Sequence, residues 1–327
     1  MDFTVRFWEL EGQQSFRAFR GHAGFVWWAV LSPDGKEIAS ASADRTIRLW
    51  NSETGESIAI LKGHTAPVTA VAYSPDGKLL ASCAGDGLVK IWDRSTKTET
   101  STFSEHKGTV TSVAFSADGK SVVSGGADGT VKVWDLATKK LTRSFDEHRG
   151  VVTAVAFHPT DQTKFASAGA DKTVRLWSVS KAEPEKSLTG HTASVSAIAF
   201  SKDGRWLASC GADKKVRVVD LTEASTAKDL IGARKILSCV TFSPNGRFLA
   251  AAGAEQEIKI WSTDTWEEVR DLKGHRDWVS SVHFSPDSRV LVSASVDRTV
   301  RIWVRTSTRS ALGGGLLRRQ ASSDCQQ

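Results

Sequence analysis

The 327-residue chain has only four cysteines, one tyrosine and one methionine, and it lacks any long apolar run. The cysteines include no Cys-x-x-Cys pair, so we expect reduced thiols and a cytoplasmic protein, with nuclear, cytoskeletal or ciliary association also open. No apolar stretch is long enough to span a bilayer, and no basic-then-apolar segment opens the chain. We therefore expect no membrane association and no secretory routing.

Catalytic and helical patterns are missing as well. The sequence shows no serine in a nucleophile elbow, no histidine-rich ligand spacing and no glycine-rich phosphate loop. No segment has the three-four spacing of an amphipathic helix. We expect an all-β protein that is not an enzyme, without catalytic, cofactor-binding or metal-binding residues.

What the chain does contain is a tryptophan at an almost constant interval. The positions are Trp8, Trp50, Trp92, Trp134, Trp177, Trp261 and Trp303, with Val219 at the one missing place. Successive gaps are 42 residues, except for one of 43. A fixed period of this length indicates a repeat array whose units must stack to bury their apolar faces.

Each period holds short β-rich runs separated by turn residues. The fullest copy has Gly21-His22, a Ser-Pro-Asp-Gly turn at residues 32–35, and a strand that ends at Trp50. Proline and glycine in that turn suit its second position and its positive φ. This pattern predicts four antiparallel strands in each unit: one after the Gly-His, one after the turn, one ending at tryptophan, and one before the next Gly-His.

Gly-His near one end of a unit and tryptophan near the other resemble the WD-repeat β-propeller family, over residues 2 to 304. The resemblance implies a seven-bladed β-propeller of four-stranded antiparallel blades over residues 1–305, with units that start near residues 21, 63, 105, 147, 190, 232 and 274. The sequence is also similar, in consensus residues only, to small stand-alone centriolar and ciliary WD-repeat proteins.

The two ends bear on closure of the ring. Asp2 to Trp8 copies a third strand, and Gln14 to Phe19 copies a fourth. We expect residues 1–20 to supply the strand that closes the seventh blade, which would remove an open edge. The third-strand copy would then be displaced, or the chain would be a fragment of a longer protein. Residues 306–327 are rich in serine, arginine and glycine, and we expect a disordered basic tail.

A second register is polar: in five units an aspartate stands six residues before the tryptophan and a serine stands ten before it. The resemblance implies that these residues form a buried hydrogen-bonded chain with the histidine of each unit. The structural sets are His22, Ser40, Asp44 and Trp50; His64, Ser82, Asp86 and Trp92; His106, Ser124, Asp128 and Trp134; His148, Ser167, Asp171 and Trp177; and His275, Ser293, Asp297 and Trp303.

Serine, histidine and aspartate together also spell a hydrolase triad. Five copies at near-identical spacing argue for structure instead, because a nucleophile is needed once per site. Two units depart from the pattern. The fifth has Val219 in place of tryptophan, and the sixth has Ala233, Ala251 and Glu255 in place of histidine, serine and aspartate. We expect these to be the least rigid units.

The net charge of +6 does not favour nucleic-acid binding. From residue 304 onward, four arginines against one aspartate carry +3 of it, so half of the excess lies in the tail. Within the units, a lysine or arginine stands two residues before every tryptophan position. These charges follow the ring and form no single stripe along a phosphate backbone.

We expect a non-catalytic scaffold that binds protein or peptide partners, as a monomeric propeller within a larger complex. The resemblance implies contacts on the top face, in the slots flanking the first apolar residue after each Gly-His. In the first and last units these slots bring together aromatic side chains bordered by arginines: Phe25, Trp27, Arg45, Trp278 and Arg298. One tryptophan of the pair at 27 and 28 should point inward as core.

Two alternatives remain open. The first is a substrate receptor or adaptor, such as a subunit of a ubiquitin ligase or of a ciliary or centriolar assembly. The arginine that such receptors often carry at the fourth position of Trp-Asp-x-Arg is absent from Trp92-Asp93-Arg94-Ser95. The second, a propeller enzyme, has no polar cluster outside the repeat to support it.

Overall fold

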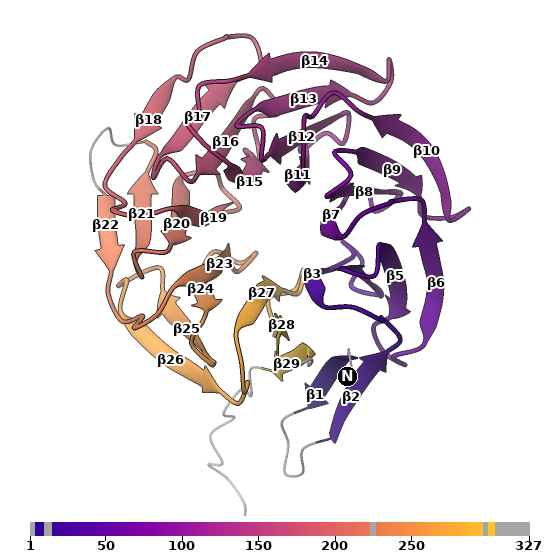
Figure 1. The fold of residues 1–327 in the computed structure, drawn as a ribbon. Coiled ribbons are helices and arrows are strands. Elements are labelled where there is room, and N and C mark those ends of the chain that lie inside the picture. The colour runs from indigo at the N-terminus through magenta and orange to yellow at the C-terminus, as the bar shows by residue number, and fades with distance from the viewer. Residues whose placement is uncertain (1–3, 10–14, 223–226, 297–299, 305–327) are drawn as a thin grey trace, which may run out of the picture.

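The computed structural model describes residues 4–9, 15–222, 227–296 and 300–304, and side chains within 21–222 and 227–296. The described residues form β-sheets arranged as a ring around a central axis (Figure 1). Six sheets have four antiparallel strands in sequence order, which confirms the predicted all-β propeller with four-stranded blades. We number the sheets 1 to 7 from the N-terminal side. Sheet 7 has three strands, and a separate two-stranded sheet precedes sheet 1.

The inner strands surround the axis and the later strands of each sheet lie progressively farther out (Figure 1). The inner strands are β3 (Val26–Leu31), β7 (Val68–Tyr73), β11 (Val110–Phe115), β15 (Val152–Phe157), β19 (Val195–Phe200), β23 (Leu237–Phe242) and β27 (Val279–Phe284). The second strands are β4 (Glu37–Ser42), β8 (Leu79–Ala84), β12 (Ser121–Gly126), β16 (Lys164–Gly169), β20 (Trp206–Gly211), β24 (Phe248–Gly253) and β28 (Val290–Ser295).

The third strands carry the periodic tryptophans. They are β5 (Thr46–Asn51), β9 (Val89–Asp93), β13 (Val131–Asp135), β17 (Val174–Ser178), β21 (Val216–Asp220), β25 (Glu257–Ser262) and β29 (Val300–Val304). The outer strands are β6 (Ser57–Lys62), β10 (Thr98–Phe103), β14 (Lys140–Phe145), β18 (Lys186–Leu188), β22 (Ala227–Leu230) and β26 (Glu268–Lys273). The part of the chain that is described holds no helix that could cross a membrane.

The hydrophobic core lies between the sheets. Every residue of β4 is buried, because each sheet is covered on both faces by its neighbours. Separate clusters of buried side chains fill the successive interfaces, for example between sheets 3 and 4, where Phe145, Phe165 and Trp177 pack together. Ala29, Ile38 and Trp50 of sheet 1 pack against Val292 and Ala294 of sheet 7. Side-chain packing therefore joins the first and last sheets of the ring.

The predicted closure by an N-terminal fourth strand is not confirmed. β1 (Thr4–Glu9) pairs with β2 (Ser15–Arg20) as a hairpin, and β1 is the strand that lies beside β29. Thr4 faces Arg20 as Thr46 faces Lys62 in the hairpin of β5 and β6, so β2 has kept its own third strand as partner. A local hairpin closes a much shorter loop than a pairing across the whole chain, which favours it entropically. The expected tail, residues 306–327, lies outside the described residues.

Two truncations distinguish β1 from β2 as the strand that protects the edge of sheet 7. Because β1 lies beside β29, deleting residues 1–9 should lower the melting temperature about as much as deleting residues 1–20. Thermal melts followed by circular dichroism give the comparison. A nearly unchanged melt after deleting 1–9, with a large loss after deleting 1–20, would show that β2 closes the ring.

Candidate functional site

A buried hydrogen-bonded chain crosses the top of each of the first four sheets. In sheet 3 the indole N–H of Trp134 donates to Ser124 Oγ (2.9 Å), and His106 Nε2 lies 2.8 Å from the same oxygen. His106 Nδ1 lies 3.0 Å from Asp128 Oδ2. A carboxylate can only accept, so Nδ1 carries the proton, Nε2 accepts from the serine hydroxyl, and the serine oxygen accepts from the indole.

Sheets 1, 2 and 4 repeat this chain with the predicted residues: Trp50, Ser40, His22 and Asp44; Trp92, Ser82, His64 and Asp86; Trp177, Ser167, His148 and Asp171. In sheet 7, His275 Nε2 lies 2.7 Å from Ser293 Oγ, and the side chains of Asp297 and Trp303 fall outside the described residues. Four segments that are separate in sequence therefore meet in each of the first four sheets.

The aspartate of each buried hydrogen-bonded chain also anchors two segments of the backbone. Asp128 accepts the backbone N–H groups of Lys107 (2.8 Å) and Thr130 (3.0 Å) and the Thr130 hydroxyl (2.8 Å). Burial alone would raise the pKa of Asp128, but these donors and His106 hold it at about 2. The loop before the inner strand is thereby tied to the turn between the second and third strands.

The geometry does not suit these groups for hydrolysis. Ser40, Ser82, Ser124 and Ser167 are 0% exposed, so no substrate reaches their hydroxyls. Burial lowers the pKa of His64, His106 and His148, more than the adjacent carboxylates raise it, which keeps the imidazoles neutral. Each serine oxygen is also occupied by an indole donor, as in sheet 3. We therefore interpret the tryptophan, serine, histidine and aspartate sets of the first four sheets as structural hydrogen-bond networks.

Sheets 5 and 6 keep parts of the chain. His191 lies 2.8 Å from both Ser209 Oγ and Asp213 Oδ2, with Val219 in place of the indole. In sheet 6, Glu255 accepts the backbone N–H of Arg234, which preserves the anchor that Asp128 makes to Lys107. The loop tie therefore survives where histidine and serine are both replaced by alanine. The relative rigidity of these sheets stays a prediction.

The predicted top-face residues lie at the start of the inner strands. Phe25, Trp27 and Trp278 are 43%, 44% and 39% exposed, and the rings of Phe25 and Trp27 lie 6.0 Å apart. Phe25 precedes β3 and Trp278 precedes β27, and these strands are neighbours in the ring (Figure 1). Arg45 is exposed in the turn after Asp44, with φ of 68°, and Ala43 of the same loop donates its backbone N–H to Phe25 O (2.8 Å). Arg298 falls outside the described residues.

The second slot of each unit has a structural role that the sequence did not reveal. A β-bulge displaces this residue from the ladder between inner and second strands in every sheet, for example between Val68 and Ala70. The displaced Thr69 donates to Val110 O of the next sheet (2.6 Å), and Ser238 donates to Val279 O (2.7 Å). Sheet 1 has Trp27 at this position. The same bulge therefore forms an inter-sheet bond in sheets 2, 3, 4 and 6 and exposes an indole in sheet 1.

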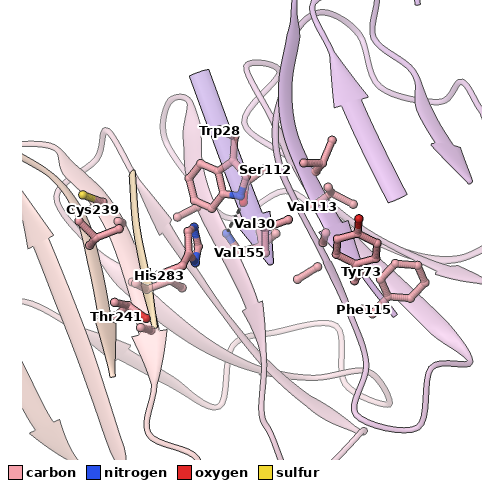
Figure 2. Close-up of a pocket in the computed structure, with 18 of the residues that line it drawn as sticks. Trp28, Val30, Tyr73, Ser112, Val113, Phe115, Val155, Cys239, Thr241 and His283 are labelled. Carbon is pink, nitrogen blue, oxygen red and sulfur yellow. Dashed lines mark hydrogen bonds between the residues drawn. The ribbon is translucent and has the colours of Figure 1, made fainter. Parts of the chain in front are cut away.

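A cavity of about 490 Å³ follows the axis and is lined by all seven inner strands (Figure 2). Four sheets have alanine at one repeat position, and three of these alanines line the cavity, where sheet 7 has His283 and sheet 1 has Val30. His283 packs edge-on against Trp28 with ring centroids 5.2 Å apart, so Trp28 is the inward member of the tryptophan pair. Among the described residues, His283 Nε2 has no hydrogen-bond partner, and no metal-binding cluster is found.

Comparison with protein-family models identifies one family. The model for the WD domain, G-beta repeat matches residues 13–51, 55–93, 97–135, 139–178, 182–220, 226–262 and 266–304. The chain therefore belongs to the WD40 repeat family. The first matched segment begins before β2, so β1 precedes the first repeat. A search of curated proteins found no match.

Removing a carboxylate tests the buried chain. Asp128→Ala would leave the His106 Nδ1–H and the Lys107 N–H without their acceptor, so we expect a loss of about 1–3 kcal/mol in unfolding free energy. Glu255→Ala, which removes one backbone anchor and no imidazole bond, should cost less. Urea melts of both variants provide the values. Equal losses would contradict a cooperative role for the histidine.

His283, which lines the axial cavity, should make the stability of the protein depend on pH. Burial lowers the pKa of His283 to about 4, whereas the unfolded chain binds that proton near pH 6.5. Because the unfolded state then binds more protons, stability falls as pH drops from about 6.5 to 4, by an order of 2 kcal/mol for this half-buried ring. His283→Ala, which copies the residue of four other sheets, should flatten the curve relative to wild type over that range. Superimposable pH profiles would contradict this assignment.

Proposed function

We propose that the protein is a non-catalytic scaffold that binds protein or peptide partners on its top face. The observation that carries the proposal is the exposed pair Phe25 and Trp27 at the start of β3, with exposed Trp278 at the start of the neighbouring strand β27; we call these three residues the aromatic group. Exposed aromatic side chains beside arginine have the composition of interface hot spots. WD40 propellers generally serve as interaction scaffolds, which supports the same function.

The aromatic group is held on well-anchored loops. Phe25 O accepts the N–H of Ala43 (2.8 Å), and Trp278 O accepts the N–H of Val296 (2.8 Å). These bonds join each aromatic loop to the loop after the second strand of the same sheet, close to the Asp44 anchor in sheet 1. A rigid aromatic surface loses little side-chain freedom on binding, which favours affinity.

Charge favours an acidic and apolar partner segment. Arg45 is exposed two residues after Ala43, whose backbone N–H donates to Phe25 O, so the Arg45 loop adjoins the Phe25 loop. An acidic residue of a partner would meet this guanidinium while apolar residues cover the aromatic rings.

The proposal includes a cytoplasmic location. The free, buried thiols of Cys83, Cys210 and Cys239 agree with it, because thiols stay reduced in that compartment.

The test compares two double variants in affinity purification of the tagged full chain. Phe25→Ala/Trp278→Ala should lose specific partners, since truncating one interface anchor typically costs about 2 kcal/mol or more. Ile58→Ala/Ile60→Ala is the matched control, because these residues of β6 are equally exposed, at 45% and 41%, on the outer strand. Melting curves of all proteins establish folding. Retention of every partner by the first variant would exclude the top face as the binding surface.

A further inference from the structure

The bottom of the junction between sheets 1 and 2 holds an arginine in a polar site. Arg94, which directly follows β9, donates to Glu37 Oε1 (3.1 Å), to Asp34 Oδ2 (3.2 Å) and to Gly77 O (3.3 Å). Its guanidinium lies 5.6 Å from the centre of the Tyr73 ring. Two carboxylates, Asp34 and Glu37, one aromatic ring and one glycine carbonyl thus surround a guanidinium.

The corresponding positions between sheets 5 and 6, each 169 residues later, have a different composition. They are Asp203 for Asp34, Trp206 for Glu37, Phe242 for Tyr73, Gly246 for Gly77, Thr263 for Arg94 and Trp266 for Lys97. We call this set the 5–6 junction. It keeps the Asp34 carboxylate, the ring and the glycine, replaces the Glu37 carboxylate by Trp206, and replaces the arginine by a short side chain.

The 5–6 junction contains a cavity of about 590 Å³. At three other junctions the residue that follows the third strand is apolar and packs against the core: Leu136, Val179 and Leu221. Thr263 is shorter, and its hydroxyl donates to Gly246 O, which replaces the bond from Arg94 to Gly77 O. The space that a long side chain would take is therefore open.

Aromatic side chains form the walls of this cavity. The rings of Trp206 and Trp266 lie 5.0 Å apart, edge to face, and Phe242 lies 6.5 Å from Trp266. Trp266 has φ of 60°, at the turn position where other sheets place Gly55 or Lys97 with positive φ. A bulky residue is disfavoured in that backbone conformation. The contacts of the Trp266 ring with Trp206 and Phe242 therefore have to offset this cost.

The charges around the cavity favour a cation. Asp203 accepts the Ser201 hydroxyl and the Arg205 N–H, and these bonds lower its pKa, so it is ionised at neutral pH. Arg205 stacks on Trp206 at 4.8 Å but pairs with the buried carboxylate of Asp220 (2.7 Å). Asp203, Asp264, Lys202 and Arg205 line the cavity, and the charge of Arg205 is matched by Asp220, which leaves two carboxylates against Lys202.

We propose that the 5–6 junction binds an arginine side chain of a protein or peptide partner. The guanidinium lies against Phe242 and the two tryptophans, with Asp203 as its counter-ion, and reproduces between two chains the contacts that Arg94 makes to Asp34 and Tyr73 within this one. The cavity lies at the ends of β19 and β23 opposite to the Phe25 and Trp278 loops, so the proposal does not depend on top-face binding.

Filling the cavity from within the chain tests its chemistry. Thr263→Arg should raise the melting temperature, because the introduced side chain meets Asp203 and Phe242 as Arg94 meets Asp34 and Tyr73. Thr263→Glu, of similar reach and opposite charge, should lower it, and Asp203→Asn should abolish the gain from Thr263→Arg. A melting temperature for Thr263→Arg no higher than that for Thr263→Glu would overturn the proposal.

Binding is measured on the full chain labelled with 5-fluorotryptophan, with the Trp206 and Trp266 signals assigned from single Trp→Phe variants. The probes are two blocked peptides, acetyl-Gly-Arg-Gly-amide and its citrulline equivalent, which has the same shape without the charge. At millimolar concentrations the arginine peptide should shift both fluorine signals, the citrulline peptide should not, and Thr263→Arg should suppress the shift. Equal shifts from the two peptides, no shift from either, or an undiminished shift in Thr263→Arg would overturn the proposal.

Discussion

The buried chain from indole through serine and histidine to aspartate is the interaction on which the rest of this structure depends. In sheet 3 it joins Trp134 on the third strand, Ser124 on the second, His106 before the inner strand and Asp128 in a turn. Each group would cost on the order of 1–3 kcal/mol if buried without a partner, so the four support one another. The aspartate extends this order to the backbone of the top-face loops.

That order decides what the two faces of the ring present. On the top face, the tied loops carry Phe25 and Trp278 on neighbouring sheets, where a bulge also turns Trp27 outward. On the bottom face, the side chain after each third strand decides whether a junction is filled by an apolar group, as with Leu136, or by a charged one, as with Arg94. Thr263 leaves its junction open. Variation at a few repeat positions thus differentiates sheets that share one framework.

The sequence predicts much of this fold because the period is regular. Turn residues and the tryptophan spacing predicted the four-stranded sheets, and the polar register predicted which histidine meets which aspartate. Closure could not be predicted, because β2 pairs locally with β1 and the competing long-range pairing has the same strand pattern. The inter-sheet bond of Thr69 also escaped prediction, since it depends on a bulge that a regular alternation of residues does not signal. The cavity at Thr263 could not be predicted either, because it depends on which residues of neighbouring sheets lie close together in space.

Hydrogen exchange of the tryptophan indole N–H protons, followed by NMR, tests the central claim most directly. The indoles of Trp50, Trp92, Trp134 and Trp177 donate to buried serines, so their exchange should require opening of the sheet and be slow. The indoles of Trp27 and Trp278, on exposed side chains, should exchange rapidly. Exchange at Trp134 as fast as at Trp27 would contradict the view that a buried hydrogen-bonded chain holds each of the first four sheets together.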